Sequence, residues 1–157
     1  MDVKGLMRLA YQSAQQSPDP SNQNGAVLVG PGGQVIQTAF NRYPRGFKPR
    51  AEHLERPRKY NFIVHAEQGA VLGVDARDCI LVCPWASCTK CAQCIVESGV
   101  ASVITHYDRM QFTPERWIDD IRDANTILES AGVYMDEIIG PLDLKFTIKV
   151  NGEDWTC

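Results

Sequence analysis

The chain has 157 residues, of which 44% are hydrophobic and 22% are charged, and its formal net charge is −3. This length is enough to bury a core without disulfides, and the composition excludes a chain that is disordered throughout. The acidic balance does not favour a broad surface for nucleic acid, and no apolar run reaches the ~20 residues that span a bilayer. We expect a single cytoplasmic domain over residues 1–157, because the N-terminus has no apolar signal segment.

Apolar periodicity predicts alternating helices and strands along the chain. A stripe at helical spacing predicts a helix over 2–16, and two apolar segments around a Pro-Gly-Gly turn predict a hairpin of 25–29 with 34–40. Residues 41–61 read as a long, basic, proline-containing loop. Beyond it we expect helices over 62–73, 89–98 and 114–131, strands over 79–83, 101–105 and 133–139, and a C-terminal edge strand or arm within 142–157.

This order of elements predicts an α/β fold with three αβα layers. A hairpin followed by strand-helix units gives a mixed five-stranded sheet with helices on both faces. The helix before the last main strand implies a parallel, right-handed crossover.

Five of the six cysteines fall between Cys79 and Cys94, which favours metal binding or burial over a disulfide framework. Among them, Cys88 and Cys91 have the spacing that lets two thiolates converge on one ion. They lie at the start of a predicted helix, whose dipole stabilises thiolate charge. With His65 they supply three zinc ligands, and catalytic zinc sites use three protein ligands and leave the fourth position to water.

Glu67 follows His65 by two residues and is the candidate catalytic group. Zinc activates water near neutral pH, and Glu67 would take the proton of that water and deliver it to a ring nitrogen and a leaving amine. Zinc deaminases carry this arrangement as H-x-E followed by P-C-x-x-C. The alternatives are a buried or surface histidine, a solvated glutamate, and a redox or buried cysteine pair.

Beyond these motifs, residues 3–140 resemble the cytidine and deoxycytidylate deaminase superfamily, most closely its deoxycytidylate deaminases. The segments that carry the resemblance are D-P-S-N-Q-N-G-A-V-L-V (19–29), F-N-R-Y-P-R-G-F (40–47), R-K-Y with V-H-A-E (58–67), and C-T-K-C-A-Q with S-G-V (88–100). The resemblance implies a cytidine-deaminase-like fold, a Zn²⁺ cofactor, and hydrolysis of dCMP to dUMP and ammonia. It also implies a homo-oligomer, either a hexamer or a smaller assembly.

Five residues are candidates for binding the nucleotide outside the zinc site. By the resemblance, Asn41 hydrogen-bonds the sugar, and the backbone around Ala26 and Ala66 lines the base pocket. Arg45, in the basic loop, is our candidate for the 5′-phosphate, because arginine matches phosphate geometry. Trp85 is either a platform for stacking the base or a core residue.

Three residues depart from the family pattern. Ser87 replaces the proline before the first cysteine, Gly69 replaces an asparagine, and Arg42 replaces a glycine. The last two lie where regulatory nucleotides bind in the family, so the sequence does not predict control by deoxynucleoside triphosphates.

Two other classes of function remain open from the sequence. One is deamination of another base, such as a modified cytosine nucleotide, dCTP, guanine, a tRNA adenosine or a riboflavin precursor. The other is a noncatalytic zinc- or nucleotide-binding module. A structural zinc site needs a fourth protein ligand, here Cys83 or Cys94, and has no use for Glu67.

Overall fold

The computed structural model describes residues 1–157, which form seven strands and five α-helices. The elements are α1 (Val3–Ala14), β1 (Gly25–Val29), β2 (Val35–Phe40), α2 (Ala66–Val71), β3 (Ile80–Val82), α3 (Thr89–Glu97), β4 (Ser102–His106), α4 (Tyr107–Met110), α5 (Ile118–Ser130), β5 (Tyr134–Ile138), β6 (Ile148–Val150) and β7 (Glu153–Trp155). Short 3₁₀ turns occupy Ala51–His53, Arg58–Asn61 and Glu115–Trp117.

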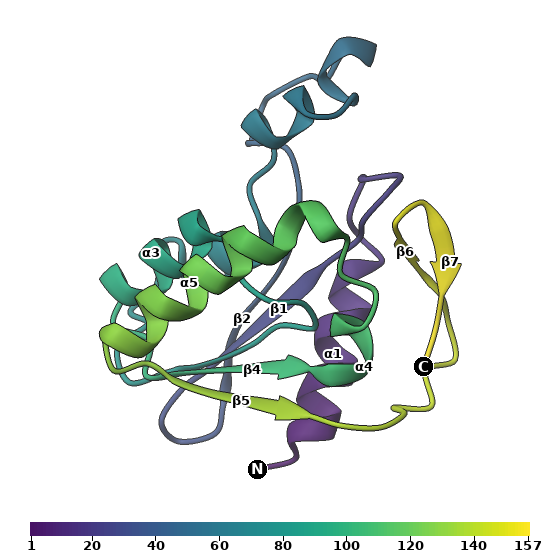
Figure 1. Ribbon diagram of the computed structural model, residues 1–157. Helices are drawn as coiled ribbons and strands as arrows, with labels where there is room; N and C mark the ends of the chain where they lie inside the picture. Colours follow the sequence, from purple (N-terminus) through teal and green to yellow (C-terminus); the bar gives the residue numbers. More distant parts are fainter.

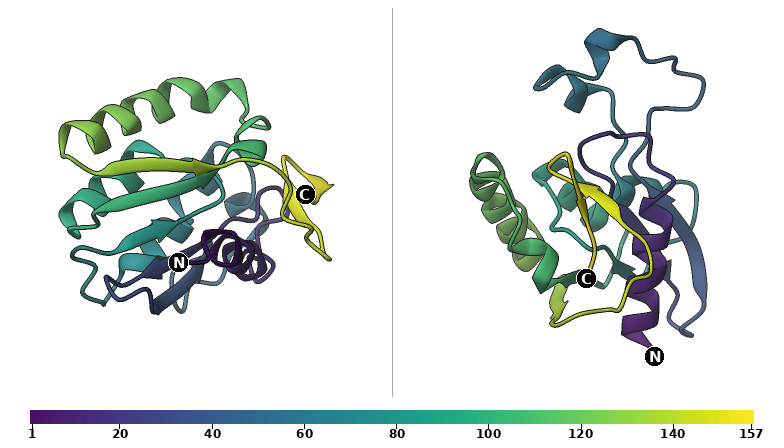
Figure 2. Two further views of the ribbon diagram at one scale, coloured as in Figure 1. Left: turned by 90° about the horizontal axis from the view of Figure 1, so that it is seen from below. Right: turned by 90° about the vertical axis from the view of Figure 1, so that its right-hand side faces the viewer.

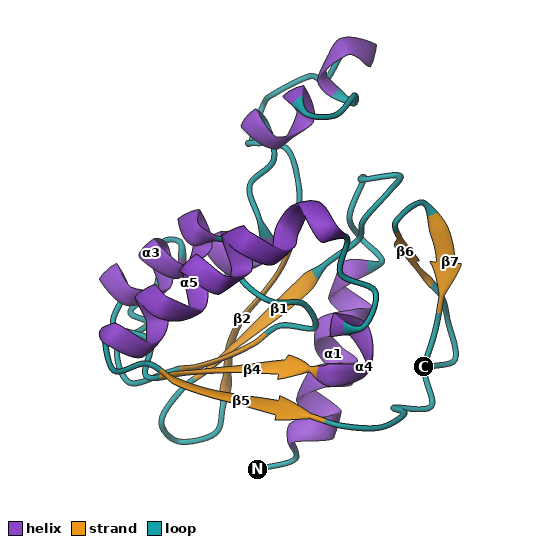
Figure 3. Ribbon diagram, viewed as in Figure 1, coloured by secondary structure: helices purple, strands orange, loops and turns teal.

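Five strands form one sheet in the order β2-β1-β3-β4-β5 (Figure 3). Strand β1 runs antiparallel to β2 and β3, whereas β3, β4 and β5 are mutually parallel. The sheet is therefore mixed, as predicted, and α5 makes the expected crossover between the parallel strands β4 and β5.

Helices cover both faces of this sheet (Figure 2). One core cluster joins the sheet to α2, α3 and α5 and includes Leu28, Leu81 and Leu128. The other joins it to α1 and the C-terminal hairpin β6-β7 and includes Val27 and Ile148. Neighbouring residues of β1 thus point to opposite cores, which is the alternation of a strand buried on both sides. The three-layer prediction is confirmed.

Two predicted elements differ from the structure. The helix expected over 62–73 begins only at Ala66, because Val64 pairs in extended conformation with Arg42, through backbone hydrogen bonds of 2.8 and 3.0 Å. The edge strand expected near the C-terminus does not join the main sheet. Instead, β6 pairs with β7 as a separate hairpin beside α1 and α4 (Figure 1).

The basic loop, residues 41–61, projects away from the sheet (Figure 1). Two rings of the loop, Phe47 and His53, pack with Phe62, which directly follows the loop, and the three centroids lie 4.6 to 5.3 Å apart. No helix of the chain combines the length and the apolar character needed to cross a membrane.

Candidate metal centre and active site

Three metal-ligating side chains meet where α2 and α3 begin. His65 and Cys88 are extended N-cap residues (ψ 157° and 169°), each directly preceding its helix. The Nδ1 atom of His65 lies 3.4 Å from Sγ of Cys88 and 3.3 Å from Sγ of Cys91. All three ligand atoms lie within 4.8 Å of one another. The two helices therefore direct their positive N-terminal ends at one point.

The geometry of this group fits a zinc ion. Zinc–sulfur bonds of about 2.3 Å and zinc–nitrogen bonds of about 2.0 Å place S and N about 3.6 Å apart in a tetrahedral site. The observed separations of 3.3 and 3.4 Å need only a few tenths of an ångström of adjustment. No other histidine, cysteine or carboxylate joins the group. Such a site has three protein ligands and a free fourth position, as catalytic zinc sites have.

Hydrogen bonding prepares one thiol for metal binding. A hydrogen bond from the Cys91 thiol, and a second contact with His65, lower the pKa of the Cys88 thiol. The thiolate is the form of cysteine that binds metal. The first proton of the Cys88–Cys91 pair is therefore lost more readily than that of an isolated cysteine.

Glu67 lies in the first turn of α2 and is only 3% exposed. Burial raises the pKa of its carboxyl to about 7, although nearby His65 opposes this shift. A carboxyl with this pKa can both accept and release a proton at neutral pH. Glu67 therefore has the properties of a general acid–base group beside the metal ligands.

A cavity opens beside these residues, and we call it the catalytic cavity. It is lined by Asp19, Asn22, Asn24, Asn41, Lys59, Tyr60, Ile63, His65, Ala66, Glu67, Trp85, Ala86, Cys88, Trp117 and Ile121. Tyr60 and Trp85 both meet Trp117 edge-to-face, with centroid separations of 5.2 and 5.8 Å. The wall thus combines aromatic faces with amide side chains, a lining suited to a planar polar ring.

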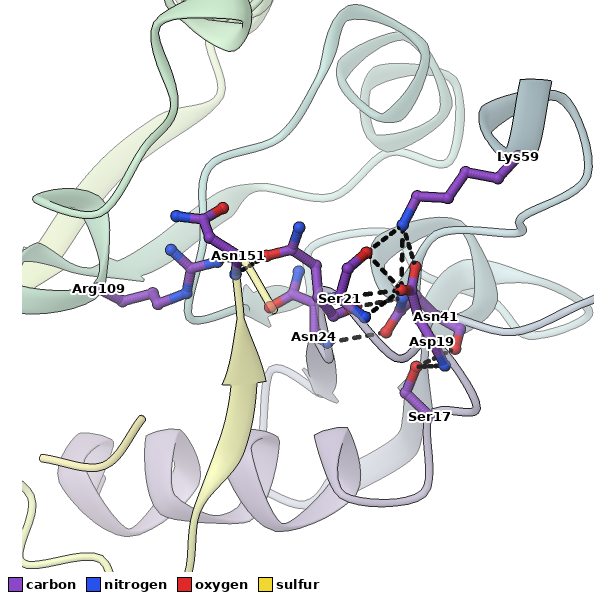
Figure 4. A network of polar contacts seen from close by, with 9 residues as sticks. Ser17, Asp19, Ser21, Asn24, Asn41, Lys59, Arg109 and Asn151 are labelled. Carbon is purple, nitrogen blue, oxygen red and sulfur yellow. Dashed lines mark hydrogen bonds and ion pairs between the residues drawn. The ribbon is translucent and has the colours of Figure 1, made fainter. Parts of the chain in front are cut away.

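A buried ion pair anchors the basic loop to this cavity (Figure 4). Lys59 Nζ lies 2.9 Å from Asp19 Oδ2, and both side chains are 5% exposed. Burial would raise the pKa of the Asp19 carboxyl, but hydrogen bonds from the Ser21 backbone and from Lys59 outweigh it and lower that pKa. Sequence reasoning did not predict this pair, which joins residues 40 positions apart.

The structure places three of the candidate nucleotide-binding residues at the catalytic cavity and two outside its lining. Asn41, Ala66 and Trp85 line the catalytic cavity. Asn41 is held at both ends of its amide, by the N–H of Asn24 and the carbonyl of Asn22, each at 2.8 Å, which leaves one N–H for a ligand. Ala26 is fully buried within β1 and does not line the cavity. Arg45 is exposed on the basic loop and lies outside the lining, so the structure does not bring it to the site.

Comparison with known proteins identifies the family. Residues 2–107 match the cytidine and deoxycytidylate deaminase zinc-binding region. The chain is 30% identical to an uncharacterized deaminase encoded in the luxG 3′ region of Aliivibrio fischeri, over 90% of this chain and 95% of that protein. It is 27% identical to the deoxycytidylate deaminase of Homo sapiens, over 85% of this chain and 78% of that one.

The fold agrees with a solved structure of the same kind. The dCMP deaminase of cyanophage S-TIM5, determined with dCMP and dUMP, superposes with a TM-score of 0.64. The match covers 86% of this chain and 95% of that one at 22% sequence identity. The motifs, the fold and the matched region together show that this chain belongs to the cytidine and deoxycytidylate deaminase family of hydrolytic deaminases.

Proposed function

We propose that this protein is a zinc-dependent hydrolase that converts dCMP to dUMP and ammonia. The observation that carries the proposal is the position of Glu67, buried at the catalytic cavity next to a three-ligand metal group. A purely structural zinc site would have no use for a buried carboxyl there, and it would need a fourth protein ligand.

In this proposal His65, Cys88 and Cys91 hold the zinc ion. When bound, zinc acts as a Lewis acid that makes water nucleophilic at neutral pH. A carboxylate oxygen of Glu67 accepts a proton from the attacking water and delivers it to N3 of cytosine. The water oxygen bonds to C4. Glu67 then takes the second proton from the new C4 hydroxyl and passes it to the exocyclic amine, so that the C4–N bond breaks, ammonia leaves and C4 becomes a carbonyl.

The cavity lining supports a cytosine nucleotide as substrate. Ala66 presents backbone beside the reacting carboxyl, and Asn41 offers its free N–H to the sugar. The aromatic faces of Trp85 and Trp117 are suited to contact the base. The choice of dCMP rests on relatives that carry this activity in their names, the human deoxycytidylate deaminase and the cyanophage dCMP deaminase.

The Glu67→Gln variant tests the catalytic role. Because glutamine keeps the shape but cannot shuttle protons, turnover of dCMP should fall about 10²- to 10⁴-fold while the zinc content stays unchanged. Glu129→Gln, at an exposed position of α5, is the matched control and should keep full activity. Equal turnover of dCMP by the Glu67→Gln variant and the wild type would show that Glu67 does not shuttle the protons, and no turnover by either would favour a noncatalytic zinc module.

A further inference from the structure

Arg109 carries a buried positive charge that no carboxylate of the chain balances. Its side chain, at the end of α4, is 1% exposed. Its guanidinium lies over the ring of Trp85, 4.9 Å from the centroid, and its Nη2 lies 3.5 Å from Oδ1 of Asn22. Its Nη1 has no hydrogen-bond partner. No acidic side chain forms an ion pair with it, in contrast to Lys59, which pairs with Asp19.

Burial lowers the pKa of Arg109 to about 10, so the guanidinium still carries its charge at neutral pH. A buried charge without a counterion is costly for a folded protein. Both residues that Arg109 contacts through its guanidinium, Asn22 and Trp85, line the catalytic cavity. The unbalanced charge therefore lies directly behind the cavity wall.

Asn22 connects the Arg109 guanidinium to the cavity. Its Oδ1 faces two donors, Nη2 of Arg109 and the backbone N–H of Asn151 at 3.0 Å. Only the oxygen of an amide can accept hydrogen bonds, so this pairing fixes which way the amide is turned. The Nδ2 group of Asn22 donates no hydrogen bond within the protein and belongs to a residue of the cavity wall. Asn22 is thus an oriented donor with a cation behind it.

The C-terminal hairpin holds Asn22 in this orientation. At its tip, Asn151 bonds to Asn22, and the N–H of Gly152 donates to the carbonyl of Ser21 at 2.8 Å. Lys149 exchanges two further hydrogen bonds with Gln23, at 2.8 and 2.9 Å. The hairpin therefore fixes the segment 21–23 beside Arg109.

We propose that Asn22, which Arg109 holds in position and polarises with its charge, selects a substrate that carries a phosphate group over the neutral nucleoside. This inference rests on the proposed function, since it concerns the substrate of the same cavity. A phosphate oxygen accepts a hydrogen bond from the free Nδ2–H of Asn22, and the negative charge of the phosphate balances the guanidinium of Arg109. Arg109 is a positioning residue in this scheme. It replaces Arg45, the exposed candidate from the sequence, as the source of selectivity for phosphate.

The Asn22→Asp variant gives the sharpest test. Aspartate keeps both hydrogen bonds at Oδ1, removes the Nδ2 donor, and supplies the missing counterion for Arg109. The protein should therefore unfold at a higher temperature, while kcat/KM for dCMP falls about 10- to 100-fold, mainly through KM. Turnover of deoxycytidine, which has no phosphate, should fall by a smaller factor than turnover of dCMP. A residue with only a structural role would not raise stability and lower selectivity together.

Three further variants complete the design. Arg109→Met should remove the preference for dCMP over deoxycytidine, and Arg109→Lys, which restores the charge, should recover part of it. Arg122→Met removes an arginine at an exposed position of α5, paired with Asp119, and should leave the preference unchanged. Assays with dCTP beside dCMP separate recognition of any phosphate from recognition of the monophosphate.

Calorimetric binding of dCMP and deoxycytidine provides a second readout that does not depend on turnover. If the wild type deaminates neither compound, the proposed function fails, but the ratio of their dissociation constants still tests the role of Asn22 and Arg109. An unchanged ratio in both Asn22→Asp and Arg109→Met would overturn the inference, even if dCMP proved to be the substrate.

Discussion

Three residues form the candidate metal site, and a nearby cysteine provides a control. Cys91 and Cys94 lie three residues apart on α3, but only Cys91 belongs to the group with His65 and Cys88. We predict that Cys91→Ala loses stoichiometric zinc and dCMP turnover, whereas Cys94→Ala keeps both. Elemental analysis of the purified variants measures this directly. Retention of zinc by Cys91→Ala would show that the ion binds elsewhere.

The Asp19–Lys59 pair makes a prediction about stability and pH. Asp19→Asn leaves the buried ammonium of Lys59 without a carboxylate and should cost about 3–5 kcal/mol at pH 7. The folded-state pKa of Asp19 is lowered, so its contribution is fully present above its ordinary pKa near 4 and is lost as the pH falls through the folded value.

The difference in unfolding free energy between the wild type and Asp19→Asn should therefore shrink as the pH falls below about 4. Urea titrations at pH 7 and at pH 3 test this. A difference that stays constant over this range would mean that the ion pair does not act through the charge of Asp19.

Local patterns predicted the metal ligands and Glu67, because each motif needs only residues close in sequence and a familiar spacing. Arg109 and Asn22 could not be predicted in the same way. They meet across 87 positions, and nothing in either local sequence shows that one will be buried against the other. His106 shows the same limit: it ends β4 fully buried and hydrogen-bonded to Tyr11 at 2.7 Å, which nothing in its local sequence indicates.

At the scale of elements, the sequence predicted the strands of the sheet better than the boundaries of the helices. The strand over 25–29 was predicted to the residue. Helix α2 starts four positions later than expected, because tertiary pairing of Val64 with Arg42 competes with helix formation. The sequence of the C-terminal hairpin does contain a turn signal. Asn151-Gly152 is a favoured two-residue hairpin turn, since both positions take positive φ, here 54° and 90°.

The positive φ of Gly152 predicts how adding a methyl group at this position affects stability. Gly152→Ala forces an L-residue into the left-handed region and should destabilise the protein by about 1–2 kcal/mol. Gly32→Ala is the control, since Gly32 has no positive φ and meets only the flexible side chain of Gln34. Thermal unfolding compares the two, and equal melting temperatures would show that the hairpin contributes little to the fold.

At the scale of the molecule, charge is segregated along the chain. Residues 42–59 contain seven basic and two acidic residues, whereas residues 115–157 contain ten acidic and four basic ones. The basic loop projects from the body and is available for contact with an acidic surface (Figure 1). In the homo-oligomer that the family resemblance implies, we expect the basic loop of one copy to contact acidic residues of another.

We therefore predict oligomers at micromolar concentration, which weaken as salt screens exposed charges. Sedimentation velocity at low and at high ionic strength measures this. A monomer under both conditions would contradict the prediction.

The most direct test of the whole account is a deaminase assay. Zinc-loaded protein is incubated with cytidine, deoxycytidine, dCMP and dCTP, and loss of the cytosine absorbance is followed with ammonia release. We predict turnover that is fastest on dCMP and that yields dUMP and ammonia in equal amounts. Zinc-loaded, folded protein that turns over none of these compounds would contradict the proposal that this cavity deaminates a cytosine nucleotide.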